Sequence, residues 1–382
     1  MSRPGVRDQV WFSRCAGYGQ EELNRQVEEA FTLLGADQEI RPGMTVVLKP
    51  NLVMNSKPEA AIATHPAVVA AVGKCVQKAG GKVVIAESPG GPYTPAAMKA
   101  IFRGCGYTDM AQSCGFALYT DCKSREVSLP GAVRCRQLSV AEPFLTRDYL
   151  IDLAKLKTHS MVGFSGAVKN LFGTVPGLQK PELHCRFPEK QPFSEMLVDL
   201  CAFLKPDLCF LDGILAMEGN GPTGGKPRKM EVLGASKSPY ALDVCAASLI
   251  GLEPESVLML REAHRRGLGP IGPEECDLLG DSMESLAQPD FLKAKASSTD
   301  FVDRLPGFLR PAAKRLVTPT PKIRKGECVG CGKCAESCPQ HTITIRGGKA
   351  VIDYRNCIRC FCCHEMCPKH VVDIRRWSLL RF

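Results

Sequence analysis

The sequence lacks any apolar run of the roughly 18 to 20 residues that a membrane-spanning helix requires. Its first residues, "MSRPGVRDQV", also lack the long apolar segment of a secretory signal peptide. We therefore expect a cytoplasmic protein without integral membrane association.

The two common nucleotide-binding fingerprints are missing as well. Neither the G-x-G-x-x-G spacing of dinucleotide-binding proteins nor the G-x-x-x-x-G-K-[ST] phosphate loop occurs, and no flavin motif is found. The nearest feature is "SPGG", in which Ser88, Gly90 and Gly91 form either a plain turn or an anion-binding turn at a helix start. These three residues are the candidates for cofactor binding.

Composition indicates a globular enzyme with two units. The chain has 382 residues, of which 45% are hydrophobic and 23% are charged. Its formal net charge of +9 suits an anionic small molecule or an acidic partner, although dispersed charge is more often a solvated surface. We do not expect a nucleic-acid ligand.

Cysteine, in contrast, is abundant and concentrated. Nine of the 20 cysteines lie between Cys328 and Cys367, where "CVGCGKCAESCP" and "CIRCFCCHEMCP" each give C-x2-C-x2-C-x3-C-P. The doubled run resembles bacterial two-cluster ferredoxins, in which each run gives three thiolates to one 4Fe-4S cluster and its fourth to the other. Structural zinc and disulfides fit this spacing poorly in a cytosolic protein.

The resemblance implies two 4Fe-4S clusters with interleaved ligands. One set is Cys328, Cys331, Cys334 and Cys367, and the other is Cys357, Cys360, Cys363 and Cys338. Cys362 is surplus to the pattern and is interpreted only as a neighbour of a cluster.

The preceding 300 residues alternate between strand and helix patterns. Strands are predicted at 44–49, 82–87, 149–154 and 207–212, with helices at 64–81, capped by Thr64, and at 240–252. The fold class is α/β, with a doubly wound, mainly parallel sheet. We expect a main domain at 1–300, a basic Pro-rich linker at 301–325 and a small α+β ferredoxin-like domain at 326–375.

Polar side chains follow the carboxyl ends of four predicted strands, where open α/β sheets bind ligands. They are Lys49 and Asn51; Glu87 and Ser88; Lys155, Lys157 and His159; and Asp212, Glu218 and Asn220. One cleft would collect all four groups.

The segment 153–173 carries four cations, Lys155, Lys157, His159 and Lys169, and no acid. Two interpretations stay open: the lysines bind an external carboxylate or phosphate, or they pair with distant acids such as Asp212 or Glu218. A Schiff-base lysine is a further alternative. A helix starting near Ser165 would point its N–H groups at the same anion.

Three histidines are candidates for chemistry. His159 lies in a polar, glycine-flanked segment and is the first candidate for a general acid. His65 is interpreted mainly as a helix-start residue. A metal held by His65, His159 and His184 is a minor hypothesis.

Several segments together resemble a known family. They are "LKPNLV", "THPAVVAAV", "GGKVVIAESPGG", "LAKLKTH", "FSGAVKNLFGTVPG", "LDGILAMEGNGPTGG" and the ferredoxin-like tail, and they resemble domain-of-unknown-function family 362 of iron-sulfur proteins. The resemblance covers about residues 40–245 and the tail, and implies no settled reaction.

Our leading hypothesis is a reductase. Electrons from a ferredoxin or flavodoxin would cross the two clusters to an anionic substrate or second cofactor, with a flavin or metal as an additional hypothesis. Proposed catalytic roles are anion binding by Lys49, Lys157 and Lys169, orientation by Asn51 and Asn170, and proton donation by His159. The alternatives are a non-catalytic electron-transfer or maturation module that docks a partner protein, and a cluster-dependent sensor.

Overall fold

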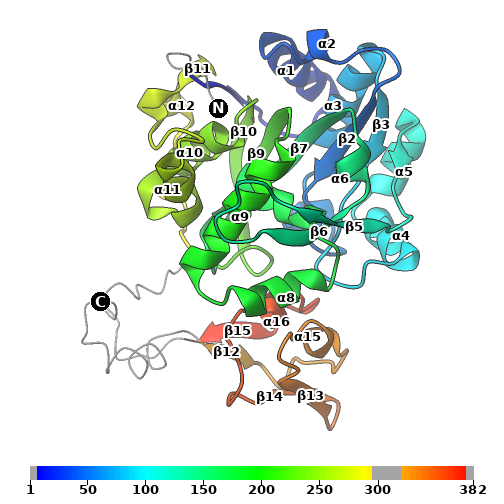
Figure 1. Cartoon of the computed structure of the whole chain (residues 1–382), viewed down its shortest axis with the longest axis vertical. Coiled ribbons are helices and arrows are strands. Elements are labelled where there is room, and N and C mark those ends of the chain that lie inside the picture. The colour runs from blue at the N-terminus through cyan, green and yellow to red at the C-terminus, as the bar shows by residue number, and fades with distance from the viewer. Residues whose placement is uncertain (1–6, 295–319, 376–382) are drawn as a thin grey trace.

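A computed structural model describes residues 7–294 and 320–375, and its larger unit is built on a nine-stranded sheet (Figure 1). Eight strands follow the order β11 (Asp277–Gly280), β1 (Gln9–Arg14), β10 (Lys226–Ser236), β9 (Leu208–Glu218), β7 (Tyr149–His159), β2 (Thr45–Pro50), β3 (Lys82–Ile85) and β4 (Ala117–Leu118), with β8 (Gly163–Ser165) paired to β7. The run from β9 to β4 is parallel, whereas β10 is antiparallel to both β9 and β1. The α/β class with a mainly parallel sheet is therefore confirmed.

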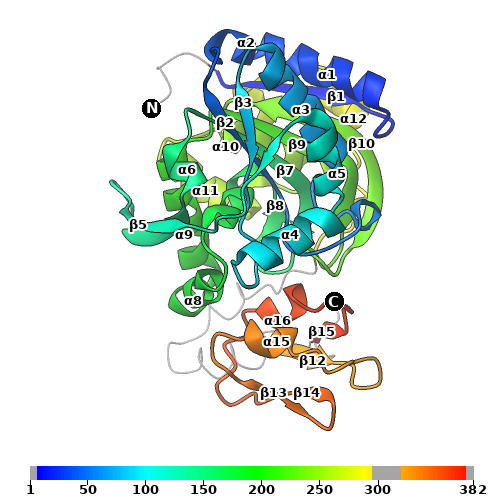
Figure 2. The ribbon, with the colours of Figure 1, turned by 90° about the vertical axis from the view of Figure 1, so that its right-hand side faces the viewer.

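Helices cover both faces of this sheet, as the two perpendicular views show (Figures 1 and 2). On one face, the core joins the sheet to α1 (Gln20–Leu33), α3 (Pro66–Lys78), α4 (Pro95–Gly104) and α5 (Tyr107–Cys114). On the other, it joins α7 (Ala167–Asn170), α9 (Lys190–Leu204), α10 (Pro239–Leu249) and α11 (Leu258–Arg265). The remaining elements of this unit are α2 (Ala36–Glu39), η1 (Pro58–Ala60), β5 (Ser124–Ser128), β6 (Gln137–Ala141), α6 (Pro143–Thr146), η2 (Leu171–Thr174), α8 (Gln179–Arg186), η3 (Pro254–Ser256), η4 (Pro273–Glu275) and α12 (Met283–Leu286).

The predicted helix at 64–81 forms, but a different residue caps it. The α3 N-cap is His65, whose side chain accepts the Ala67 N–H, and Pro66 occupies the first turn. Thr64 instead is buried, donating its hydroxyl to the Leu153 carbonyl at 2.7 Å and accepting the Asn51 N–H at 2.9 Å. Thr64 therefore ties two strand ends together rather than starting the helix.

Two central strands extend beyond their predicted lengths. β7 and β9 each continue for 11 residues, where the sequence pattern predicted six. Consequently Lys155, Lys157 and His159 lie within β7, and Asp212 and Glu218 lie within β9. These polar residues project from paired strands rather than loops, and the β7–β9 register shifts between Lys155 and Lys157.

The smaller C-terminal unit has two antiparallel strand pairs, of which only one is a hairpin, and two short helices. β12 (Thr320–Ile323) pairs antiparallel with β15 (Val372–Arg375), and β13 (Ile343–Arg346) with β14 (Lys349–Ile352). The helices α15 (Lys333–Glu336) and α16 (Cys362–Glu365) each contain part of one cysteine run and contact each other. Of the expected linker 301–325, residues 301–319 lie outside the described residues, and 320–323 form β12.

No helix within residues 7–294 and 320–375 combines the length and apolarity needed to cross a bilayer.

Candidate functional site

The cysteines of the C-terminal unit surround two separate cavities. Cys328, Cys331, Cys334 and Cys367 line the first, which we call the outer cluster cavity. Cys338, Cys357, Cys360 and Cys363 line the second, the inner cluster cavity, together with Cys362. Each cavity thus gathers one of the two ligand sets predicted from the ferredoxin-like spacing.

Backbone donors point at several of these sulfurs. The N–H of Ala350 lies 3.4 Å from Cys328 Sγ, that of Thr342 3.3 Å from Cys338 Sγ, and that of Val371 3.4 Å from Cys367 Sγ. The Ala350 bond is the main reason that the pKa of Cys328 is lowered. Thiolates with N–H donors are the environment that 4Fe-4S clusters use, so the residues fit such clusters.

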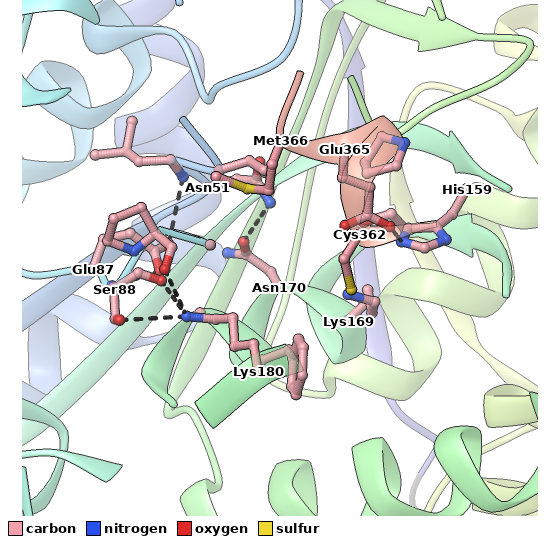
Figure 3. Close-up of a pocket in the computed structure, with 18 of the residues that line it drawn as sticks. Asn51, Glu87, Ser88, His159, Lys169, Asn170, Lys180, Cys362, Glu365 and Met366 are labelled. Atoms are coloured by element: carbon pink, nitrogen blue, oxygen red, sulfur yellow. Dashed lines mark hydrogen bonds and ion pairs between the residues drawn. The ribbon is translucent and has the colours of Figure 1, made fainter. Parts of the chain in front are cut away.

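A third cavity, of about 80 Å³, lies at the carboxyl ends of the parallel strands and is closed by the C-terminal unit (Figure 3). We call it the central cavity. Its main-unit wall includes Asn51, Glu87, Ser88, Lys157, His159, Lys169, Asn170, Lys180 and His184, and its other wall is Ser337, Cys362, Glu365 and Met366. This volume has room for about five water molecules or one small organic acid.

A few polar contacts join the two units beside this cavity. Thr223 donates its hydroxyl to the Glu365 carbonyl at 3.1 Å, and a ring nitrogen of His364 lies 3.3 Å from the Asn220 carbonyl. Gln340 Nε2 also donates to Cys185 Sγ of α8 at 3.3 Å. These contacts place α16 against the cation-rich end of the sheet.

One buried hydrogen-bond chain spans the main-unit wall. Lys157 Nζ donates to Asn51 Oδ1 at 2.7 Å, Asn51 Nδ2 donates to Asn170 Oδ1 at 2.8 Å, and Asn170 Nδ2 donates to Asp152 Oδ1 at 2.8 Å. All four side chains are buried. We call this the lysine–amide–aspartate chain. Both asparagines therefore hold neighbouring protein groups in place.

The lysine–amide–aspartate chain ends in two groups with shifted pKa values, Lys157 and Asp152. Burial lowers the pKa of Lys157 well below its usual value, and the nearby charges of Lys155 and Lys169 lower it further. Lys157 also donates to the Ile62 carbonyl at 2.7 Å and has no ion pair with a described carboxylate. Burial raises the pKa of Asp152 to about 8, and its Oδ2 has no partner among the described residues.

Two of the other predicted lysines are paired within the protein. Lys49 Nζ lies 2.9 Å from Glu87 Oε2, and Lys155 Nζ lies 2.7 Å from Asp212 Oδ2. Tyr18 also donates its hydroxyl to Asp212 Oδ1 at 2.9 Å, so Asp212 is held by both Lys155 and Tyr18. The interpretation of pairing with a distant acid is therefore correct for Lys155, whereas Lys49, predicted to bind an anion, is already paired with Glu87.

Lys169 is the lysine that stays available to a ligand. It is half-buried, and its ammonium lies 4.7 Å from the Phe172 ring centre and 5.9 Å from that of Phe193. No described carboxylate comes within 4.0 Å of it. Burial lowers its pKa, and the charge of Glu365 offsets part of that effect. A cation over aromatic faces, at the edge of a cavity, is suited to binding an anion.

His159 presents one nitrogen to the central cavity. Its Nδ1 accepts N–H groups from Met161 at 3.1 Å and Val162 at 3.4 Å, so the neutral ring carries its proton on Nε2. Nε2 has no hydrogen-bond partner among residues 7–294 and 320–375, and it lies 3.6 Å from Glu365 Oε1 (Figure 3). Burial and neighbouring lysines lower its pKa well below 6.5. At neutral pH His159 is therefore a hydrogen-bond donor, whereas a general acid would need the imidazolium form.

The other two histidines do not join His159 at one metal-binding point. His184 lines the central cavity but stacks on Phe193 at 4.4 Å, and burial lowers its pKa to about 3. His65 stacks on Tyr18 at 3.6 Å, outside the cavity lining. Within the part of the chain that the structure describes, no group of three His, Cys, Asp or Glu side chains has the arrangement of a single metal-ion site.

Other groups of the protein already contact the turn at 88–91. Ser88 Oγ accepts the Gly177 N–H at 2.7 Å and the Lys180 ammonium at 3.3 Å. Gly90 and Gly91 lie beneath Met366, whose Sδ would be 2.7 Å from a Cβ at Gly90. The two glycines thus allow the C-terminal unit to approach closely, and the predicted cofactor contact of Ser88, Gly90 and Gly91 stays a prediction.

The short helix after Ser165 is already capped. Asp243 accepts the N–H groups of Ala167 at 2.6 Å and Val168 at 2.9 Å. The expectation that these groups face an external anion is therefore wrong, because α10 supplies an internal carboxylate. Glu218, also predicted at the cleft, accepts the Leu292 N–H at 3.0 Å instead.

Sequence reasoning missed Lys180 and Glu365. Lys180 donates to the carbonyls of Ser88, Pro89 and Val175, and burial lowers its pKa to about 7. Glu365 reaches the cavity from between two predicted cluster cysteines. Its position in "HEMC" was visible in the sequence, but no local pattern indicated that α16 faces the sheet.

Comparisons with known proteins agree with this architecture. Residues 46–248 match the family described as "Domain of unknown function (DUF362)", and residues 320–368 match a 4Fe-4S dicluster domain. A curated relative, the thylakoid-associated protein sll1697 of Synechocystis sp., is 34% identical over 241 residues, covering 63% of this chain and 73% of that protein. The cytoplasmic location of this chain stays a prediction.

Two solved structures show limited similarity. The lactate racemase apoprotein of Thermoanaerobacterium thermosaccharolyticum gives a TM-score of 0.39 at 13% identity, covering 66% of this chain and 59% of its own. A Thermotoga maritima protein gives 0.37 at 9% identity, covering 59% and 57%. The chain thus spans less than two thirds of either protein.

The lysine–amide–aspartate chain predicts a stability cost for Asn51→Leu. Leucine has a similar size but leaves Lys157 without one acceptor and Asn170 Oδ1 without its donor. We expect a loss of about 2–4 kcal/mol in the free energy of unfolding, since each unsatisfied buried group costs about 1–3 kcal/mol. Chemical denaturation followed by circular dichroism measures it. The control is Asn24→Leu on α1, where Asn24 is half-buried and accepts one solvent-exposed hydrogen bond from Gln20 at 2.6 Å. It should change stability by less than about 1 kcal/mol, and an effect equal to that of Asn51→Leu would contradict the importance of the lysine–amide–aspartate chain.

Asp152 predicts a pH dependence of stability. Its folded pKa of about 8 exceeds the unfolded value of about 3.9. Between these values the folded state binds one more proton, so this group's contribution to stability is full below about pH 4 and is lost as pH rises towards 8. In Asp152→Asn, unfolding free energies measured at pH 5.5, 7 and 8.5 should fall less steeply with pH than in wild type. Parallel curves would refute the raised pKa.

Proposed function

Because the chain belongs to the DUF362 family and carries a 4Fe-4S dicluster domain, we propose that it is an iron-sulfur oxidoreductase that reduces a small anionic substrate in the central cavity. A low-potential carrier of the ferredoxin or flavodoxin class would be its electron source. When bound, two 4Fe-4S clusters would supply single electrons at the cavity. One observation carries the proposal: the same cavity is lined by Lys157, His159 and Lys169 and by α16, which also contains Cys363.

The charges of the cavity favour an anion. Lys157, Lys169 and Lys180 line it, against the acids Glu87 and Glu365. Lys49 already neutralises Glu87 at 2.9 Å. A carboxylate on the substrate would therefore offset the remaining positive charge of the lysines. Lys169 would be its direct partner, because no described carboxylate forms an ion pair with that ammonium.

The buried donors suit a reaction in which negative charge develops. The Nε2–H of His159 would donate a hydrogen bond to the oxygen on which that charge accumulates. A two-electron reduction also needs two protons. The lowered pKa of Lys157 makes its ammonium a better donor of one of them than an ordinary lysine, and the other would come from solvent water. His159 would thus stabilise charge while Lys157 supplies a proton, a division that revises the role predicted for His159.

Iron and sulfide analysis tests the first requirement of this proposal. We expect roughly eight iron and eight sulfide per chain after anaerobic purification or reconstitution, from two four-iron clusters. EPR of the dithionite-reduced protein should show both clusters, and extraction should reveal any flavin. A protein that binds zinc and shows no visible charge-transfer absorption would refute the ferredoxin interpretation.

The catalytic proposal is tested with His159 and Lys169 variants. Reduced protein is mixed anaerobically with a panel of small 2-oxo and unsaturated carboxylates, and its reoxidation is followed by visible absorption. We expect His159→Ala to retain its iron but to slow the productive reaction by about 10²–10³, as loss of a charge-stabilising donor does. His159→Gln, which keeps an N–H donor, should recover part of the rate, and Lys169→Gln should mainly weaken substrate binding.

The controls separate this proposal from the alternative. Reduction of every variant by dithionite should match wild type, because the variants leave the cysteines intact. If no carboxylate reoxidises the wild type or perturbs its EPR spectrum, the non-catalytic electron-transfer or maturation module becomes the better interpretation. Unchanged turnover in His159→Ala would remove its assigned role.

A further inference from the structure

The two cluster cavities differ in what surrounds them. The inner cluster cavity shares Cys362 with the central cavity, and Gln340 on its rim donates to Cys185 of α8 at 3.3 Å. Among the described residues, the outer cluster cavity shares no lining residue with the central cavity. The inner cavity therefore faces the main unit, and the outer cavity lies on the side away from the substrate.

The rim of the outer cluster cavity is unusually open. Cys331 is exposed, although it belongs to a predicted ligand set. Its neighbour Val329 is 59% exposed, the highest value among the large apolar side chains in the described ranges. An exposed apolar residue beside a solvent-facing thiol gives a short path from an external protein to the first cluster.

The charges around this rim leave a small positive excess once local pairs are counted. Lys333 pairs with Glu336 at 2.9 Å, and Arg324 pairs with Glu327 at 2.9 Å and also with Asp373. Lys325 and Lys369 are exposed and form no ion pair with a described carboxylate, and Lys369 lines the cavity itself. The unpaired charges are thus Lys369, which lines the cavity with Val329 and Cys331, and Lys325, which lies three residues before the cavity-lining Cys328.

From these observations we propose that the outer-cavity rim, formed by Lys325, Val329, Cys331 and Lys369, is the docking surface for an acidic one-electron carrier protein. The inference rests on the proposed electron-transfer function and adds where electrons arrive and in which order they move. Cys328, Cys331, Cys334 and Cys367 would hold the outer 4Fe-4S cluster, which would accept the one electron that the reduced carrier loses in each encounter.

The charge pattern explains why the partner is acidic. Complementary charges accelerate encounter and hold a transient complex in the right orientation, and their effect weakens as ionic strength rises. The single apolar side chain Val329 gives a small dry contact, which suits a partner that must leave after one electron. An acidic carrier is therefore favoured over a permanent subunit.

The test compares two charge reversals on the complete holoprotein. Lys325→Glu with Lys369→Glu changes the proposed surface, and Lys74→Glu with Lys82→Glu makes the same charge change on α3 and β3 of the main unit, where both lysines are exposed. The probe is a reduced flavodoxin. Its Kd is measured across ionic strengths by surface plasmon resonance, and cluster reduction is followed by stopped-flow absorption, with dithionite as the small reductant.

We expect the rim variant to raise the Kd for flavodoxin at least about tenfold at low salt, with the difference shrinking at high salt. Carrier-driven reduction should slow in parallel, whereas dithionite reduction and the visible spectrum stay at wild-type values. Lys325→Gln with Lys369→Gln should give an intermediate Kd. The control variant should bind flavodoxin as wild type does.

An equal effect of both reversals would overturn the proposal, because it would reflect net charge alone. An unchanged Kd and reduction rate in the rim variant would overturn it as well. No substrate is present in these measurements, so the docking surface and the proposed reductase reaction can fail independently.

Discussion

The central cavity depends on the lysine–amide–aspartate chain. A lysine ammonium without a carboxylate partner is costly to bury, and here two asparagine side chains, both fixed in orientation, connect Lys157 to Asp152 across β2, β7 and α7. An asparagine amide carries one acceptor oxygen and one donor nitrogen. The hydrogen bond at one end of each amide therefore determines its orientation for the hydrogen bond at the other end. The result is a cation held at the cavity wall without an adjacent anion that would cancel its field.

This arrangement separates structural charges from those available to a ligand. Lys49 and Lys155 are held by Glu87 and Asp212, and removing one partner of such a buried pair leaves an uncompensated charge in the core. Lys169, in contrast, rests on two aromatic faces and opens to the cavity. The segment 153–173 therefore contains a lysine that is paired inside the protein and a lysine that faces the cavity. The difference between them comes from the residues that pack against each one.

The sequence predicted those parts of the site that follow from local pattern. The spacing of the cysteine runs indicated which thiols share a cavity, and the strand ends indicated where Asn51, Lys157 and His159 would gather. Contacts across long sequence separations could not be predicted. Asp243 caps α7 from 76 residues away in the sequence, and Lys180 donates a hydrogen bond to Ser88, 92 residues away. The lowered pKa of His159 could not be predicted either, because it depends on burial and on neighbouring lysines that only the fold brings together.

The position of α16 makes two cavities share one wall. This four-residue helix contributes Cys363 to the inner cluster cavity, and it contributes Cys362 and Glu365 to the central cavity. Any movement of the thiols in the inner cluster cavity that displaces α16 would therefore also reshape the central cavity, although no sequence pattern links the two.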